Sequence, residues 1–109
     1  MKERIAIIDG LRSPIAKANG KLNDMSADTL GAIITKELVL RNDIDYKEFD
    51  EVIMGNVAQP SKAMNIARVM AIRAGFPQST PAYTVHRNCA SGMQSISSAI
   101  EKIYSNQGD

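Results

Sequence analysis

The 109-residue chain contains a single cysteine, a single histidine and no tryptophan. One cysteine excludes an internal disulfide, and the lone Cys and His do not form a metal-ligand pattern. The chain also lacks an excess of charge of either sign, because its 13 basic and 12 acidic residues give a net charge of +1. No run of Lys or Arg is present. The composition therefore excludes the basic footprint expected for binding nucleic acid or an anionic membrane surface.

Long hydrophobic runs are missing as well. The apolar stretches, such as Ile5–Ile8 and Leu38–Leu40, are far shorter than the roughly 20 residues that cross a bilayer. The segment Met1–Arg4 leads directly into a strand-like run and does not resemble a signal peptide. We therefore expect a cytoplasmic protein without membrane association. The hydrophobic fraction of 44% and the charged fraction of 23% are typical of one globular domain with a modest core.

β-Rich and helical segments alternate along the chain. Composition and alternation predict three strands, at residues 4–9, 51–57 and 81–88. The first is apolar enough to be buried on both faces of a sheet. Helical spacing predicts three helices, from Ser26 to about Arg41, from Asn65 to Ala74, and from Ala90 to about Tyr104. This order predicts an α/β fold with a mainly parallel sheet and helices packed on it.

Local signals refine these boundaries. Ser26 is the expected N-cap of the first helix, and Gly75 is expected to end the second in a left-handed conformation. Residues 17–25 are rich in turn formers and are predicted as a surface loop. Met70 and Met93 occupy apolar helical positions, so both are predicted to fill the core.

Cys89 lies where the third strand meets the third helix. The unpaired N–H groups and the dipole of a helix N-terminus favour a thiolate and can stabilise an oxyanion. The small residues Ala90, Ser91 and Gly92 leave room for an acyl group, as in a nucleophile elbow. The simpler alternative is that Cys89 is only a small buried hydrophobic residue. From placement alone both interpretations stay open.

His86 stands three residues before Cys89 and could be considered as its general base. Whether it reaches the sulfur depends on the turn that follows the strand, so a structural or interface role is the better interpretation. Arg68 and Arg87 are interpreted as partners in packing or interface ion pairs.

The residues around Cys89 resemble a known family signature. Asn88-Cys89-Ala90-Ser91-Gly92-Met93-Gln94 is similar to the acyl-intermediate motif of thiolases. Further similarities occur in the family's order at Arg12-Ser13-Pro14-Ile15, at Asp50-Glu51-Val52-Ile53-Met54-Gly55-Asn56-Val57, at Asn65-Ile66-Ala67-Arg68 and at Ala74-Gly75-Phe76-Pro77. Three departures stand out: Lys62-Ala63-Met64 replaces the usual Gly-Gln, Ile66 replaces Pro, and His86 replaces Asn.

The resemblance implies an acyltransferase of fatty acid metabolism that uses coenzyme A thioesters as substrates, binds no cofactor and forms a homo-oligomer. Cys89 would become S-acylated, and the kinetics would be ping-pong. In the family, an activating His, a second Cys and an Asn-anchored oxyanion site come from later motifs. Residues 1–109 are therefore expected to be the first portion of the thiolase N-terminal domain, without useful turnover alone.

Two alternatives stay open beside the thiolase interpretation. A ketoacyl synthase of the same fold uses a similarly placed cysteine, although Ser91-Gly92-Met93-Gln94 favours a thiolase. A non-catalytic truncated module would instead pair with another subunit through the apolar surface that an incomplete core leaves exposed.

Overall fold

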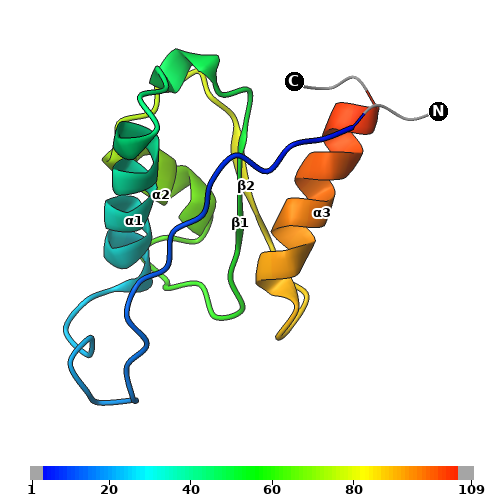
Figure 1. Ribbon diagram of the computed structural model, residues 1–109. Coiled ribbons are helices and arrows are strands. Elements are labelled where there is room, and N and C mark those ends of the chain that lie inside the picture. Colours follow the sequence, from blue (N-terminus) through cyan, green and yellow to red (C-terminus); the bar gives the residue numbers. More distant parts are fainter. Residues whose placement is uncertain (1–3, 106–109) are drawn as a thin grey trace.

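The computed structural model describes residues 4–105, in which two parallel strands lie at the centre. Strand β1 (Val52–Gly55) pairs with β2 (Ala82–Val85), with Val52 opposite Ala82 and Gly55 opposite Val85. Helices α1 (Ala27–Arg41) and α2 (Ile66–Ala74) lie on one side of the strands, and α3 (Ser91–Tyr104) lies on the other (Figure 1). A 3₁₀ helix, η1 (Tyr46–Glu48), connects α1 to β1. The predicted α/β class is confirmed.

The core lies between α1, α2 and β1. Helix α2 is the crossover between the parallel strands, and its residues Ile66, Ala67 and Ala71 are 0% exposed. The ring of Phe76 meets the rings of Tyr46 and Phe49 edge-on, at centroid distances of 4.9 and 5.3 Å. Aromatic pairs in this geometry stabilise a core beyond their buried area. The small residues of α2 thus allow it to pack closely on both the sheet and α1.

The helix predictions agree closely with the structure. All three helices begin and end within one residue of the expected positions. Gly75 ends α2 at φ 111°, in the left-handed region that favours glycine. Ser26 is the N-cap of α1, but its hydroxyl pairs with the Thr29 hydroxyl at 2.9 Å and does not cap the backbone. Met70 is buried as predicted, whereas Met93 is 67% exposed, so its assignment to the core was wrong.

Side chains from other parts of the chain accept hydrogen bonds from the first backbone N–H groups of α2. The N–H of Ile66 donates to Gln59 Oε1 at 2.9 Å, and the N–H of Ala67 donates to Thr84 Oγ1 at 3.0 Å. Thr84 Oγ1 donates in turn to Asn65 Oδ1 at 2.9 Å. These bonds satisfy N–H groups that a helix leaves without internal partners. They also fix β2 against α2, and β2 carries the turn that follows it.

Residues 4–9 do not form the predicted strand. The segment is extended without ladder pairing, and Ile7 and Ile8 are 75% and 76% exposed instead of buried. A strand requires a neighbour to which its N–H and C=O groups can bond. Neither described strand pairs with this segment. The apolar composition of residues 4–9 therefore did not predict the pairing or the burial of this segment.

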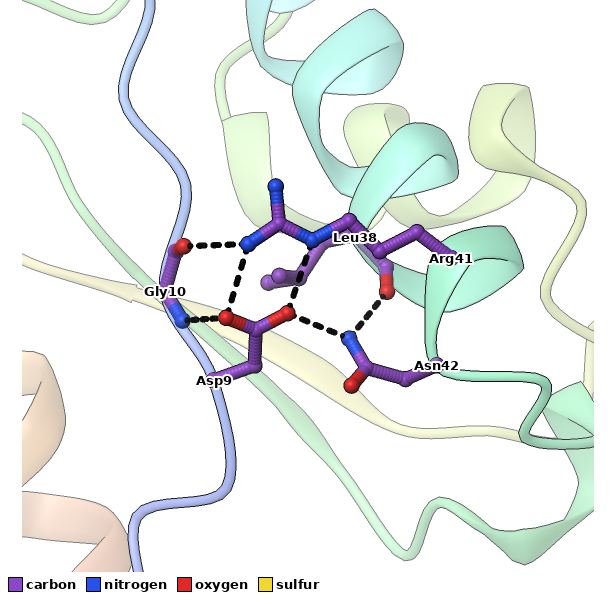
Figure 2. A network of polar contacts seen from close by, with 5 residues as sticks. All are labelled: Asp9, Gly10, Leu38, Arg41 and Asn42. Carbon is purple, nitrogen blue, oxygen red and sulfur yellow. Dashed lines mark hydrogen bonds and ion pairs between the residues drawn. The ribbon is translucent and has the colours of Figure 1, made fainter.

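A polar network attaches this N-terminal segment to the end of α1 (Figure 2). Asp9 accepts hydrogen bonds from Arg41 Nε and Nη2 at 2.9 and 2.8 Å and from Asn42 Nδ2 at 2.7 Å. Arg41 Nη2 also reaches the carbonyl of Gly10 at 3.1 Å, and Asn42 Nδ2 donates to the carbonyl of Leu38 at 2.8 Å. The two-pronged contact of Arg41 with a carboxylate is geometrically specific. One carboxylate therefore joins the segment to the C-terminal turn of α1.

Acidification should release this segment. The hydrogen bonds from Arg41, then from Asn42 and the Gly10 N–H, hold the pKa of Asp9 well below its ordinary value. Because the folded pKa is depressed, the stabilisation is fully present above the unfolded value of about 3.9 and declines progressively as the pH falls from there towards the folded value. Solvent screens this partly exposed pair, so we expect local release without global unfolding. Amide exchange should show less protection at Gly10 near pH 3 than at pH 7.

An Asp9→Asn variant is the matched control for that measurement. It removes the charge and should leave Gly10 weakly protected at both pH values. Equal protection of Gly10 in the unsubstituted chain at both pH values would show that the carboxylate does not hold the segment.

Candidate active site

The candidate site is the tight turn between β2 and α3. The predicted third strand extended to Asn88, but β2 ends at Val85, and residues 86–90 form the turn. Cys89 lies in this turn, is exposed, and precedes the first residue of α3 by two positions. The alternative of a buried structural cysteine is thus wrong, while the predicted strand-to-helix junction is correct.

Asn88 gives the turn its sharpness. Its φ is 46°, in the left-handed region. Among residues with a side chain, Asn is one of those that adopt this region most readily, because its short polar side chain can hydrogen-bond to the nearby backbone. The chain therefore turns sharply immediately before Cys89, and the exposed thiol belongs to the turn that follows β2.

Hydrogen bonds within the turn connect it to the first turn of α3. The N–H of Ala90 donates to the carbonyl of Arg87 at 3.0 Å, and the N–H of Ser91 donates to that of Asn88 at 3.1 Å. These two N–H groups are therefore not free to stabilise an oxyanion. If the N-terminus of α3 stabilises an oxyanion, backbone N–H groups other than those of Ala90 and Ser91 must donate the hydrogen bonds.

The space around the turn is open on the side of Gly92 and Met93. A Cβ placed on Gly92 would meet nothing within 4 Å, and the Met93 side chain is 67% exposed. The expectation that small residues leave room next to Cys89 is consistent with this arrangement. An incoming acyl group would not have to displace a packed side chain there.

Gly55 is a structural determinant of the site that sequence reasoning did not identify. A Cβ at this last residue of β1 would lie 2.3 Å from both the carbonyl carbon and the carbonyl oxygen of Ser91. It would also lie 2.6 Å from the Gly92 nitrogen. Only a glycine allows β1 to approach the first turn of α3 this closely. A glycine within a predicted strand is the signal that could have indicated such contact.

An ion pair holds the C-terminal end of α3 against the sheet. Lys102 Nζ lies 2.5 Å from Glu51 Oε2 and 5.3 Å from the centre of the Tyr83 ring. The hydrogen bond that Lys102 donates to the Glu51 carboxylate raises the pKa of Lys102 above its ordinary value. Helix α3 is thus fixed to the sheet at both ends, at Gly55 near its start and at Glu51 near its end.

His86 takes part in shaping the turn. The residue is exposed, and its Nδ1 accepts the backbone N–H of Asn88 at 3.2 Å. This bond supports the structural role expected for it. The geometry supplies no contact that would assign His86 as a base for Cys89.

Arg68 and Arg87 form hydrogen bonds to neutral groups within the described residues, which agrees with the predicted packing role, while the alternative of interface ion pairs stays a prediction. Arg68 donates to the carbonyls of Thr80 and Gln78, both at 2.8 Å, and so supports the loop before β2. Arg87 Nη1 donates to Gln94 Oε1 at 2.5 Å, from the turn to the first part of α3. Both arginines therefore contribute to the position of β2 and of the turn.

A cavity of about 440 Å³ lies away from the turn, between α1, β1 and α3. Its lining includes Leu38, Ile53, Ile96 and Ile103 but no residue of the turn 86–90. It is therefore not the place where an acyl group on Cys89 would lie. Further apolar side chains are exposed elsewhere, among them Ile15, Ile33 and Met64. Apolar surface is exposed, as the incomplete-core interpretation predicted.

Among residues 4–105, no helix has both the length and the apolar character needed to cross a membrane.

Comparisons with known proteins agree with one another. Residues 5–109 match the family described as "Thiolase, N-terminal domain". A "Probable acetyl-CoA acyltransferase" of Staphylococcus aureus is 35% identical over 106 residues, which cover 97% of this chain and 27% of that protein. The protein with the same name from Staphylococcus epidermidis is 37% identical over 100 residues, covering 92% and 25%.

Solved structures show the same relationship. The crystal structure of the Bacillus anthracis acetyl-CoA acetyltransferase matches with a TM-score of 0.84 and 37% identity, covering 89% of this chain and 25% of that one. Human mitochondrial 3-ketoacyl-CoA thiolase in complex with CoA matches with a TM-score of 0.77 and 37% identity, covering 82% and 23%. The chain thus spans about a quarter of the length of the relatives that it matches.

Proposed function

This chain belongs to the thiolase family, and on that premise we propose that Cys89 is the acyl-accepting thiol of an acyl-CoA C-acyltransferase. The observation that carries the proposal is the exposure of Cys89 in a tight turn that leads into α3. An exposed thiol on a short, hydrogen-bonded turn can meet a large thioester substrate, whereas a buried one cannot. Family membership also favours the thiolase interpretation over a ketoacyl synthase.

The proposed chemical step is transfer of an acyl group between two sulfur atoms. The sulfur of Cys89 attacks the thioester carbonyl, a new sulfur–carbon bond forms, and the bond to the coenzyme A sulfur breaks. Coenzyme A leaves and takes up the proton that the Cys89 thiol gives up, directly or through solvent. The acyl group then passes to a second acceptor, either the sulfur of free coenzyme A or the α-carbon of an acetyl thioester. The bond to the Cys89 sulfur breaks, the acceptor loses a proton, and the Cys89 thiol regains one directly or through solvent.

Coenzyme A thioesters are the proposed substrates, and fatty acid metabolism is the proposed setting. The printed names of the relatives support both, and one solved relative is described as a complex with CoA. We propose a cytoplasmic homo-oligomer. The exposed apolar side chains support association, because apolar surface favours burial against a partner.

The described turn supplies the acceptor but not a complete catalytic set. The chain contains one cysteine and one histidine, and His86 bonds to the turn backbone. We therefore propose that residues 1–109 act as the first portion of the thiolase N-terminal domain. Alone they take one acyl group slowly and do not complete a cycle.

Incubation of the purified chain with acetyl-CoA tests this function. We expect a mass increase of one acetyl group, located on Cys89 by peptide mapping, with release of one coenzyme A per acetyl group. When the chain is incubated with acetoacetyl-CoA and free coenzyme A, we expect no continuing cleavage of the acetoacetyl-CoA. Acetylation confined to lysines would contradict the acceptor role, and sustained cleavage would contradict the incomplete role.

A non-catalytic interaction module is the second candidate. The apolar cavity between α1, β1 and α3 favours it, because its lining is open to a partner. This candidate predicts that the chain self-associates and that Cys89 takes no acyl group. The acetyl-CoA incubation separates the two functions, because only the acyl acceptor predicts a thioester adduct, whereas both predict self-association.

A further inference from the structure

The hydroxyl of Ser91 joins the two sides of the turn that carries Cys89. Ser91 is 4% exposed. Its Oγ accepts the backbone N–H of Arg87 at 2.9 Å and donates to the carbonyl of Asn88 at 2.7 Å. One side chain therefore bonds to both residues that precede Cys89, while its own backbone lies two positions after it.

The first turn of α3 lacks the usual cap. Its N-cap residue is Ala90, which has no side-chain oxygen and is among the poorer residues at this position. Ser91 directs its hydroxyl backwards into the turn, where it bonds the backbone on both sides of the left-handed Asn88. A left-handed non-glycine residue costs free energy and persists only where its surroundings hold it. The Ser91 hydroxyl supplies such a restraint.

Strand β1 holds Ser91 from the other side. The backbone of Gly55 lies so close to the Ser91 carbonyl that no side chain fits between them. The next residue, Asn56, donates its N–H to the carbonyl of Val85 at 3.1 Å and so joins the end of β1 to the end of β2. Ser91 is therefore a fixed point between β1 and the turn.

From these contacts we propose that Ser91 is a positioning residue, which orients the Cys89 sulfur for attack on an acyl thioester. The proposal rests on the proposed function of Cys89 as acyl acceptor. Ser91 acts through the turn backbone and does not touch the acyl group. Without the Ser91 hydroxyl, the Cys89 thiol would still be exposed but would no longer be held in one orientation.

The test compares two reactions of the same sulfur in Ser91→Ala. Attack on a thioester demands a defined approach, whereas alkylation by iodoacetamide demands much less. We expect acyl transfer from acetyl-CoA to fall roughly tenfold or more, since small misplacements of a reacting group have effects of this order. Alkylation should change by less than about threefold.

Ser95→Ala is the matched control. Ser95 lies one turn later on α3, and its hydroxyl also donates to a backbone carbonyl, that of Gly92 at 2.6 Å. It contacts neither side of the turn, so both reactions should proceed as in the unsubstituted chain. Circular dichroism establishes that each variant is folded under the assay conditions.

Amide exchange at Arg87 provides an independent readout, because this N–H donates to Ser91 Oγ. It should accelerate in Ser91→Ala and stay unchanged in Ser95→Ala. Unchanged Arg87 exchange, unchanged acyl transfer, or an equal fall in acyl transfer and alkylation would each overturn the positioning role. If the unsubstituted chain takes no acyl group, the proposed function fails, and Arg87 exchange still decides whether Ser91 holds the turn.

Discussion

Replacing Cys89 with Ser is expected to abolish acyl transfer to this chain. A serine hydroxyl stays protonated near neutral pH and is a weak nucleophile without an activating base, whereas a thiol is partly ionised and intrinsically more reactive. We expect the initial rate of acetyl incorporation from acetyl-CoA to fall on the order of a hundredfold or more. Intact mass measured over time, with labelled acetyl-CoA for sensitivity, provides the rate.

Stability should be unaffected by this substitution. Cys89 is exposed, and the turn is held by the backbone and by Ser91, so the free energy of unfolding should change by no more than about 0.5 kcal/mol. Cys89→Ala should give the same loss of transfer and the same stability. An acetyl adduct that forms as fast in Cys89→Ser as in the unsubstituted chain would place the acceptor elsewhere.

Gly55→Ala is expected to have the largest effect on the fold near the site. The new Cβ would lie 2.3 Å from the Ser91 carbonyl carbon and oxygen, which are backbone atoms and cannot turn aside. Either β1 or the first turn of α3 must shift. Overpacking of this kind costs about 1–3 kcal/mol. In a chain of this size each kcal/mol corresponds to roughly 4–8 °C in Tm.

The same substitution should also impair acyl transfer, because the shift acts on the peptide that follows Ser91. Thermal melting followed by circular dichroism measures the first effect, and acetyl incorporation well below the melting temperature measures the second.

Gly10→Ala and Gly92→Ala are the controls for Gly55→Ala. A Cβ at either position would meet nothing within 4 Å. Gly92 lies inside α3, where alanine is favoured by about 0.5–1 kcal/mol, so Gly92→Ala should melt at or above the Tm of the unsubstituted chain. If Gly55→Ala melts like these controls, β1 does not hold α3 in the described contact.

The helices and the site could be predicted from local patterns. Apolar residues at helical spacing placed all three helices, and Gly75 signalled the end of α2 because few other residues adopt its conformation. The order of Asn88, Cys89 and the small residues after it placed the thiol at a strand-to-helix junction. Such features depend on neighbours within a few positions, so a single sequence contains their cause.

Pairing and close approach could not be predicted in this way. Residues 4–9 have the composition of a buried strand, yet Asp9 attaches them to Arg41 without a ladder, across 32 positions of sequence. Met93 has an apolar helical position but faces solvent, because no described element covers that side of α3. Periodicity indicates which side of a helix is apolar and does not indicate what packs against it.

Local sequence patterns were enough to predict the α/β class, the three helices and the position of the single cysteine in a thiolase-like motif. The exposure of Cys89 and the way its turn is held depend on tertiary contacts: Asn88 lies in a left-handed turn, Ser91 bonds across it, and Gly55 of β1 lies against the start of α3. The reason is physical. Local conformation follows from each residue's own sterics, whereas the orientation of a side chain depends on atoms brought together from distant parts of the chain.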